Sequence, residues 1–113
     1  MALALALTLE PAIGSPVNAE PLYAAHCARC HGAQGQGGQG FARPIWGPAS
    51  DLRRFGTAQG LLEYLLLLMP FDDPARLAPE QKQVLVRYML WRHGSIGAAA
   101  LEGDKWDGQT PIR

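Results

Sequence analysis

The sequence predicts a single small domain of the all-α class. Segments with helical spacing of apolar residues carry start and stop signals at their ends, and no segment shows the alternation of a strand. The chain has 113 residues, which suits about one domain, and its 48% hydrophobic and 18% charged content is that of a globular protein. Its formal net charge of zero gives no electrostatic case for binding nucleic acid or an anionic membrane.

Residues 1–19 are expected to lie outside this domain. Ala2–Leu9 resembles the apolar region of a signal peptide, and Val17–Ala19 has the small residues that precede a cleavage site. Because no Lys or Arg precedes the apolar run, the segment is interpreted as a truncated signal or a flexible N-terminal extension. In the body of the chain the longest apolar run, Leu65–Met69, is far shorter than the ~20 residues of a membrane-spanning helix.

The first predicted helix covers about Ala19–Cys30. Asn18 can serve as its N-cap, and Pro21 lies in the first turn, where a missing N–H costs little. Tyr23 and Cys27 recur at helical spacing. After this helix comes a long stretch rich in Gly and Pro, residues 32–56, and a loop of this length in a small domain needs a functional reason.

The second predicted helix covers about Thr57–Leu68. Thr57 can cap its N-terminus and Pro70 ends it. Leucines cover most sides of this helix, so it must be buried or pack against something large and apolar.

The third predicted helix covers about Pro79–His93. Pro79 suits the first helical position, Glu80 favours the N-terminal dipole, and Gly94 suits the position after the last turn. The apolar stripe that this helix should bury consists of Val84, Leu85, Tyr88 and Met89.

Both cysteines of the chain lie in the heptapeptide HCARCHG, residues 26–32. On one helical turn, residues three and four apart share a face, so Cys27, Cys30 and His31 can present two thiols and one imidazole to one flat object. Haem suits this arrangement, because its two vinyl groups can take up the thiols as thioethers while its iron takes the imidazole. The spacing is the signature of c-type haem attachment.

Three other interpretations of the motif are weaker. A thioredoxin-like redox pair would need a surrounding βαβ pattern, which the sequence lacks. A zinc site would need a fourth ligand, and the nearest candidate, His26, directly precedes Cys27 in poor geometry. A disulfide between Cys27 and Cys30 would close a tiny loop and stabilise little.

Haem iron that is bound by a histidine often takes a methionine on its other face, which raises the reduction potential. Met69 lies where the leucine-rich helix breaks at Pro70, so its thioether could reach the open haem face. Met89 lies on the apolar stripe of the last helix, where core packing is the simpler interpretation. We therefore expect His31 and Met69 to be the iron ligands, with core packing as the alternative role of Met69.

The order of these features resembles a class I c-type cytochrome. The attachment motif is followed by a Gly-rich loop, by Met69–Pro70 and by LAPEQKQVLVRYMLWRHG. The resemblance implies an all-α fold around one covalently attached haem, with a cytochrome c domain over residues 20–94 and a C-terminal extension over 95–113. It also implies that the first and last helices cross, with Tyr23 near Tyr88, and that the protein works in the periplasm or elsewhere outside the cytoplasm.

A finer resemblance concerns the stretches PIWGPAS, MPFDDPARLAPEQ and YMLWRHGSIG. These look like haem subunits of sulfite-oxidising and related sulfur-oxidising dehydrogenases. The C-terminal extension departs from that pattern because it contains no methionine.

Further residues are expected around the haem. In the family a proline carbonyl accepts the second N–H of the iron-bound imidazole, and Pro44 is the candidate here, with Pro48 as the fallback. The haem propionates need hydrogen-bond donors, and the enclosing loop offers Arg43, Trp46, Arg53 and Arg54, which otherwise would be solvated arginines and a packed tryptophan. The expected apolar walls of the pocket are Leu61, Leu65, Leu66 and Phe71, which equally suit a plain core.

The resulting functional prediction is an electron-transfer protein that is not itself an enzyme. It would carry single electrons from a periplasmic dehydrogenase, such as a sulfite-oxidising one, to an oxidase or another cytochrome, through a small transient interface. One alternative is a haem protein with an open sixth position that binds ligands or acts as a peroxidase-like enzyme, which requires that Met69 not ligate. Another is an interaction module in which the haem is mainly structural and the two extensions dock a partner.

Overall fold

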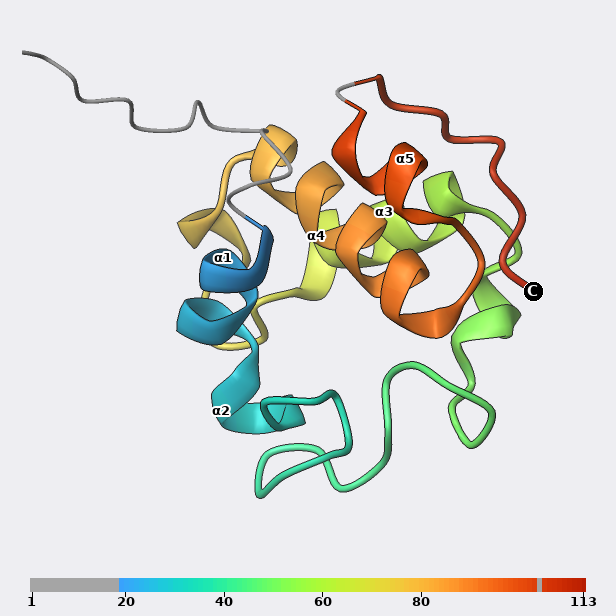
Figure 1. Cartoon of the computed structure of the whole chain (residues 1–113). Coiled ribbons are helices and arrows are strands. Elements are labelled where there is room, and N and C mark those ends of the chain that lie inside the picture. Colours follow the sequence, from blue (N-terminus) through green and yellow to red (C-terminus); the bar gives the residue numbers. More distant parts are fainter. Residues whose placement is uncertain (1–18, 104) are drawn as a thin grey trace, which may run out of the picture.

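The computed structural model describes residues 19–103 and 105–113, and its described part is helical (Figure 1). Within those ranges the backbone forms no β-strand, and an isolated antiparallel bridge joins Thr57 to Pro111. The all-α class that the sequence predicts is thus the observed one. The α-helices are α1 (Ala19–His26), α2 (Ala28–His31), α3 (Ala58–Leu68), α4 (Pro79–His93) and α5 (Ala98–Glu102), with short 3-10 turns at Leu52–Phe55 and Pro74–Arg76.

The first predicted helix is divided into α1 and α2 at Cys27. The backbone of Cys27 has φ −123° and ψ −34°, outside the helical range of φ, although its N–H still bonds the carbonyl of Tyr23 at 2.9 Å. The expectation of one continuous helix over 19–30 was therefore wrong at this residue. The expected cap Asn18 lies outside the described residues.

Helices α3 and α4 begin and end where the sequence predicts. The Thr57 hydroxyl accepts the N–H of Gly60 at 3.2 Å and caps α3, which ends before Pro70. Pro79 opens α4, and Gly94 follows it with φ 94°, a left-handed conformation that favours glycine. The buried face of α4 is wider than the predicted apolar stripe, because it also includes Lys82, Val86, Arg87 and Leu90.

The core forms where α4 packs against α1, α3 and α5 (Figure 1). At the crossing of α1 and α4 the rings of Tyr23 and Tyr88 lie 5.5 Å apart, which confirms the expected meeting of these residues. Trp46, from the long loop, joins them with ring centroids 5.2 Å from Tyr23 and 5.9 Å from Tyr88. An aromatic cluster of Tyr23, Trp46 and Tyr88 therefore fastens the long loop to the helical core.

The C-terminal segment packs on the start of α3. The carbonyl of Thr110 accepts the N–H of Ala58 at 2.8 Å, and that of Gly108 accepts the N–H of Gln59 at 2.9 Å. These N–H groups belong to the first turn of α3 and have no partner within the helix. Ile112 is buried in the core cluster. Carbonyls of the C-terminal segment thus accept the first N–H groups of α3, which would otherwise bond to water.

Candidate haem-binding site

The two cysteines lie on one turn at the start of α2. Cys27 precedes this helix and Cys30 lies within it, and the N–H groups of Cys30 and His31 both bond the Cys27 carbonyl, at 3.2 and 3.0 Å. Both thiols are free and partly buried. Burial, with a smaller contribution from Cys30, raises the pKa of Cys27 to about 12, against the lowering effect of Arg76. A reactive redox dithiol needs the opposite shift, so this environment does not favour a thioredoxin-like role.

His31 ends α2 with its ring half-buried. Burial lowers its pKa, so the imidazole is neutral at neutral pH, which is the form that coordinates a metal. The ring of Phe41 meets it edge-on, with centroids 5.2 Å apart. Its Nδ1 is buried and has no hydrogen-bond partner in the described part of the chain. The expected bond from His31 to the carbonyl of Pro44, or of Pro48, is therefore not formed in this structure and stays a prediction.

The Gly-rich loop lies directly against the attachment turn. A Cβ on Gly40 would lie 2.6 Å from the Cys30 sulfur, and one on Gly38 would lie 3.0 Å from the Cys30 carbonyl oxygen. The His31 carbonyl accepts the N–H of Gly37 at 2.7 Å. Side chains at these glycines would push the loop away from Cys30, which gives a physical reason for the glycine content.

Met69 lies at the end of α3 with an extended backbone and packs, partly buried, against the core. The segment that follows Met69 is tied to the attachment turn, because Asp72 forms an ion pair of 2.5 Å with Arg29 of α2 and one of 2.9 Å with Arg76. The ion pair of Arg29 with Asp72 thus joins the two segments that carry the expected iron ligands. Met89 is 9% exposed within α4, as expected of a core residue.

The four expected propionate donors lie in different surroundings. Arg43 forms an ion pair of 2.5 Å with Asp51, and the Arg54 guanidinium lies 4.3 Å from the centroid of the Phe55 ring. Trp46 is buried in the aromatic cluster, while Arg53 is exposed. Their roles as propionate donors remain predictions.

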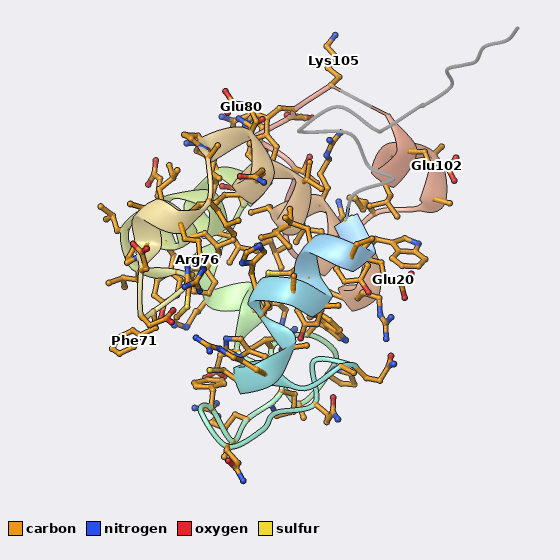
Figure 2. The ribbon with its side chains drawn as sticks, turned by 90° about the vertical axis from the view of Figure 1, so that its left-hand side faces the viewer. Glu20, Phe71, Arg76, Glu80, Glu102 and Lys105 are labelled. Atoms are coloured by element: carbon orange, nitrogen blue, oxygen red, sulfur yellow. The ribbon has the colours of Figure 1, made fainter. Side chains whose placement is uncertain are left out.

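The expected apolar walls divide into buried and exposed residues. Leu61 and Leu65 are buried in the core, whereas Leu66 is 37% exposed. Phe71 is 80% exposed and points away from the body of the protein (Figure 2). Phe71 therefore does not line a closed pocket in this structure, and its contact with haem stays a prediction.

Sequence reasoning missed two polar residues of α4 that contact the segments of the site. The Nδ1 of His93 accepts the N–H of Gly47 at 2.8 Å, which holds the long loop against the end of α4. Lys82 is buried and bonds backbone carbonyls near Met69. A signal for Lys82 exists, since it shares a helix face with Leu85 and Met89 at i, i+3 and i+7.

These residues fit a covalently bound haem. The turn offers two free thiols and one neutral imidazole. The Nδ1 of His31 is buried without a partner among the described residues, and it is the ring nitrogen that donates to a fixed acceptor when the other nitrogen binds a metal. No helix in the described ranges is long and apolar enough to cross a membrane. Among the same residues, no three or more His, Cys, Asp or Glu side chains gather as a metal-ion site would require.

Comparisons with known proteins agree with this chemistry. The family model described as cytochrome c oxidase, cbb3-type, subunit III matches residues 15–89. Over 96 aligned residues the chain is 36% identical to a thiosulfate dehydrogenase of Allochromatium vinosum, and the match covers 76% of this chain but 33% of that relative. The chain thus spans about a third of the length of this relative. No solved structure gives a significant match.

The matched region contains the attachment turn, the Gly-rich loop, Met69 and most of α4. Haem c and electron transport are the cofactor and the role that a cytochrome c domain implies, and Cys27 and Cys30 have the spacing of its attachment site. The chain belongs to the family of cbb3-type cytochrome c oxidase subunit III and is a monohaem c-type cytochrome related to sulfur-oxidising enzymes.

Proposed function

We propose that this protein is a periplasmic electron carrier that accepts single electrons from a sulfur-oxidising dehydrogenase and passes them to an oxidase or another cytochrome. In this proposal Cys27 and Cys30 would hold one haem c, and His31 and Met69 would supply the side chains that bind its iron. The single observation that carries the proposal is the attachment turn, on which two free, partly buried thiols and the imidazole of His31 lie together.

When bound, haem c supplies a one-electron ferric–ferrous couple. The chain would hold this group in position. The two thiols tether the group to α2, and the neutral His31 ring supplies the nitrogen ligand. Met69 offers a thioether from the partly buried end of α3, and a soft sulfur ligand of this kind favours the reduced iron and raises the potential. No bond in a substrate is made or broken by these side chains, so the proposed role is electron transfer without catalysis.

The proposed donor oxidises a sulfur oxyanion. The motifs of the sequence favour a sulfite-oxidising dehydrogenase, while the relative from Allochromatium vinosum is a thiosulfate dehydrogenase. The two donors can be separated by mixing the oxidised carrier with either enzyme and its substrate and following haem reduction. We expect the faster reduction with the sulfite enzyme. Faster reduction with the thiosulfate enzyme would assign thiosulfate oxidation as the source of the electrons.

The axial ligands can be tested by visible spectroscopy of the haem-loaded protein. The ferric wild type should show the weak long-wavelength band that marks iron–methionine bonding, and Met69→Ala should lose it. Met89→Ala is the matched control, because Met89 packs in α4 and should leave the band in place. If the wild type lacks the band and its reduced form binds carbon monoxide readily, the sixth position is open. The alternative of a ligand-binding or peroxidase-like haem protein would then replace the carrier.

A further inference from the structure

We propose that Lys82 is a positioning residue for Met69, because its buried ammonium group holds both ends of the segment that carries this methionine. The inference rests on the proposed function, in which Met69 is an iron ligand. Lys82 is 2% exposed, and its Nζ donates to the carbonyl oxygens of Leu65 at 2.8 Å and Pro74 at 2.6 Å. A longer contact of 3.4 Å reaches the carbonyl of Leu66.

The number of acceptors indicates that Lys82 acts as a cation. A lysine ammonium has three N–H donors and no acceptor, and three carbonyl oxygens surround it here. A neutral amine would turn its lone pair toward one of these oxygens. The charge also suits its place, since Leu65 and Leu66 lie in the last turn of α3, where a helix dipole favours positive charge.

The position of the acceptors along the chain gives Lys82 its role. Leu65 and Leu66 precede Met69, and Pro74 follows it, so one side chain from the core helix α4 closes the loop between them. Asp72 also links this loop to the rest of the protein, but its ion pairs with Arg29 and Arg76 are solvent-exposed. Exposed ion pairs contribute little to holding a fixed geometry. The buried contacts of Lys82 are therefore the ones that can fix the end of α3.

Lys82→Met keeps a side chain of similar length but removes the donor from the carbonyls of Leu65 and Pro74. A buried acceptor without its donor lowers global stability, so unfolding has to be measured beside the ligand readout. A change at Met69 that exceeds the loss of global stability would then reflect positioning. Lys105 supplies the matched control, because it is exposed and projects from the surface (Figure 2).

The experiment uses the haem-loaded protein with the substitutions Lys82→Met, Lys82→Gln and Lys105→Met. The readouts are the iron–methionine band of the ferric form, the rate at which imidazole displaces Met69, and global unfolding followed by circular dichroism. We expect both Lys82 variants to weaken the band and to speed imidazole binding at least about tenfold, the factor that one charge-assisted hydrogen bond represents. Lys105→Met should match the wild type.

Two results would overturn the inference. One is a Lys82→Met protein with the wild-type band and the wild-type rate of imidazole binding. The other is a loss of the band that follows global unfolding in parallel in both Lys82→Met and Lys82→Gln, because a merely structural role predicts that. A wild type that lacks the band, with Met69→Ala unchanged, refutes the proposed function and this inference together. A wild type with the band and unaffected Lys82 variants refutes the inference alone.

Discussion

Substitution of Gly35 by alanine should destabilise the protein more than the same change at Gly94, which also has a positive φ. Gly35 has φ 67°, and a Cβ built there would lie 2.4 Å from Cε2 of the Trp46 indole. The indole cannot simply move away, because Tyr23 and Tyr88 pack around it with ring centroids 5.2 and 5.9 Å away. Gly94 is the natural reference, since it has φ 94° and a methyl group added there would meet no atom within 4 Å.

The magnitudes follow from these two environments. An L-residue in the left-handed region costs roughly 1–2 kcal/mol, and both substitutions carry this cost. Overpacking of a filled site adds about 1–3 kcal/mol, and this applies to Gly35 alone. We therefore expect Gly35→Ala to lower the free energy of unfolding by about 2–5 kcal/mol and Gly94→Ala by about 1–2 kcal/mol.

The assay is denaturant unfolding of the haem-loaded variants, followed by far-ultraviolet circular dichroism and by haem absorbance. Two-state transitions with equal slopes give the difference in free energy directly. Equal losses for Gly35→Ala and Gly94→Ala would refute the reasoning, because they would mean that the aromatic cluster yields to an added methyl group. A larger loss of stability in Gly35→Ala than in Gly94→Ala would establish that the packing of Trp46 requires a glycine at position 35.

Three further changes test other contacts. Thr57→Ala should lower stability by about 1 kcal/mol, since it removes the acceptor of the Gly60 N–H, and Thr57→Ser should restore most of it in the same unfolding assay. Ile112→Ala should cost about 2 kcal/mol if the chain end packs as described, whereas no measurable loss would show that the C-terminal segment does not support α3. The hydrogen bond from Arg76, opposed by some desolvation, holds the pKa of Asp72 below its usual range. The contribution of this carboxylate is therefore present at neutral pH and lost as the pH falls through that lowered pKa. Asp72→Asn should remove this part of the acid and salt dependence of imidazole binding, and a profile identical to the wild type would contradict the role of the ion pair.

Local signals account for the parts of the fold that the sequence predicts correctly. Thr57 and Pro70 bound α3, and Pro79 and Gly94 bound α4, because caps, prolines and glycines act on their immediate neighbours. The break between α1 and α2 at Cys27 has no such local cause, because neither a proline nor a glycine lies at this position. The capping of α3 by the C-terminal segment depends on contacts between distant parts of the chain, so it was not predicted. Helix α5 lies in the C-terminal extension, for which no element was predicted.

The residues of the candidate site likewise fall into those that local spacing predicts and those that depend on the tertiary structure. The thiols of Cys27 and Cys30 and the imidazole of His31 follow from spacing alone, because one turn brings them together. The partners of Arg43 could not be predicted, since a flexible exposed side chain has several acceptors within reach. Lys82 was overlooked because a lysine is ordinarily solvated, although its place on the apolar face of α4 was visible in the sequence.

The exposure of the last turn of α3 explains why polar contacts matter there. Leu67 is 75% exposed and Leu68 is 42% exposed, so hydrophobic burial in the turn that ends at Met69 comes mainly from Leu65 and the partly buried Met69. The other end of α3 is held by the carbonyls of the C-terminal segment, which act on its first N–H groups. Helix ends fray where few contacts hold them, and fraying at this end of α3 would move the proposed ligand. Lys82 acts at that far end through buried contacts with backbone carbonyls, which add to the burial of Leu65.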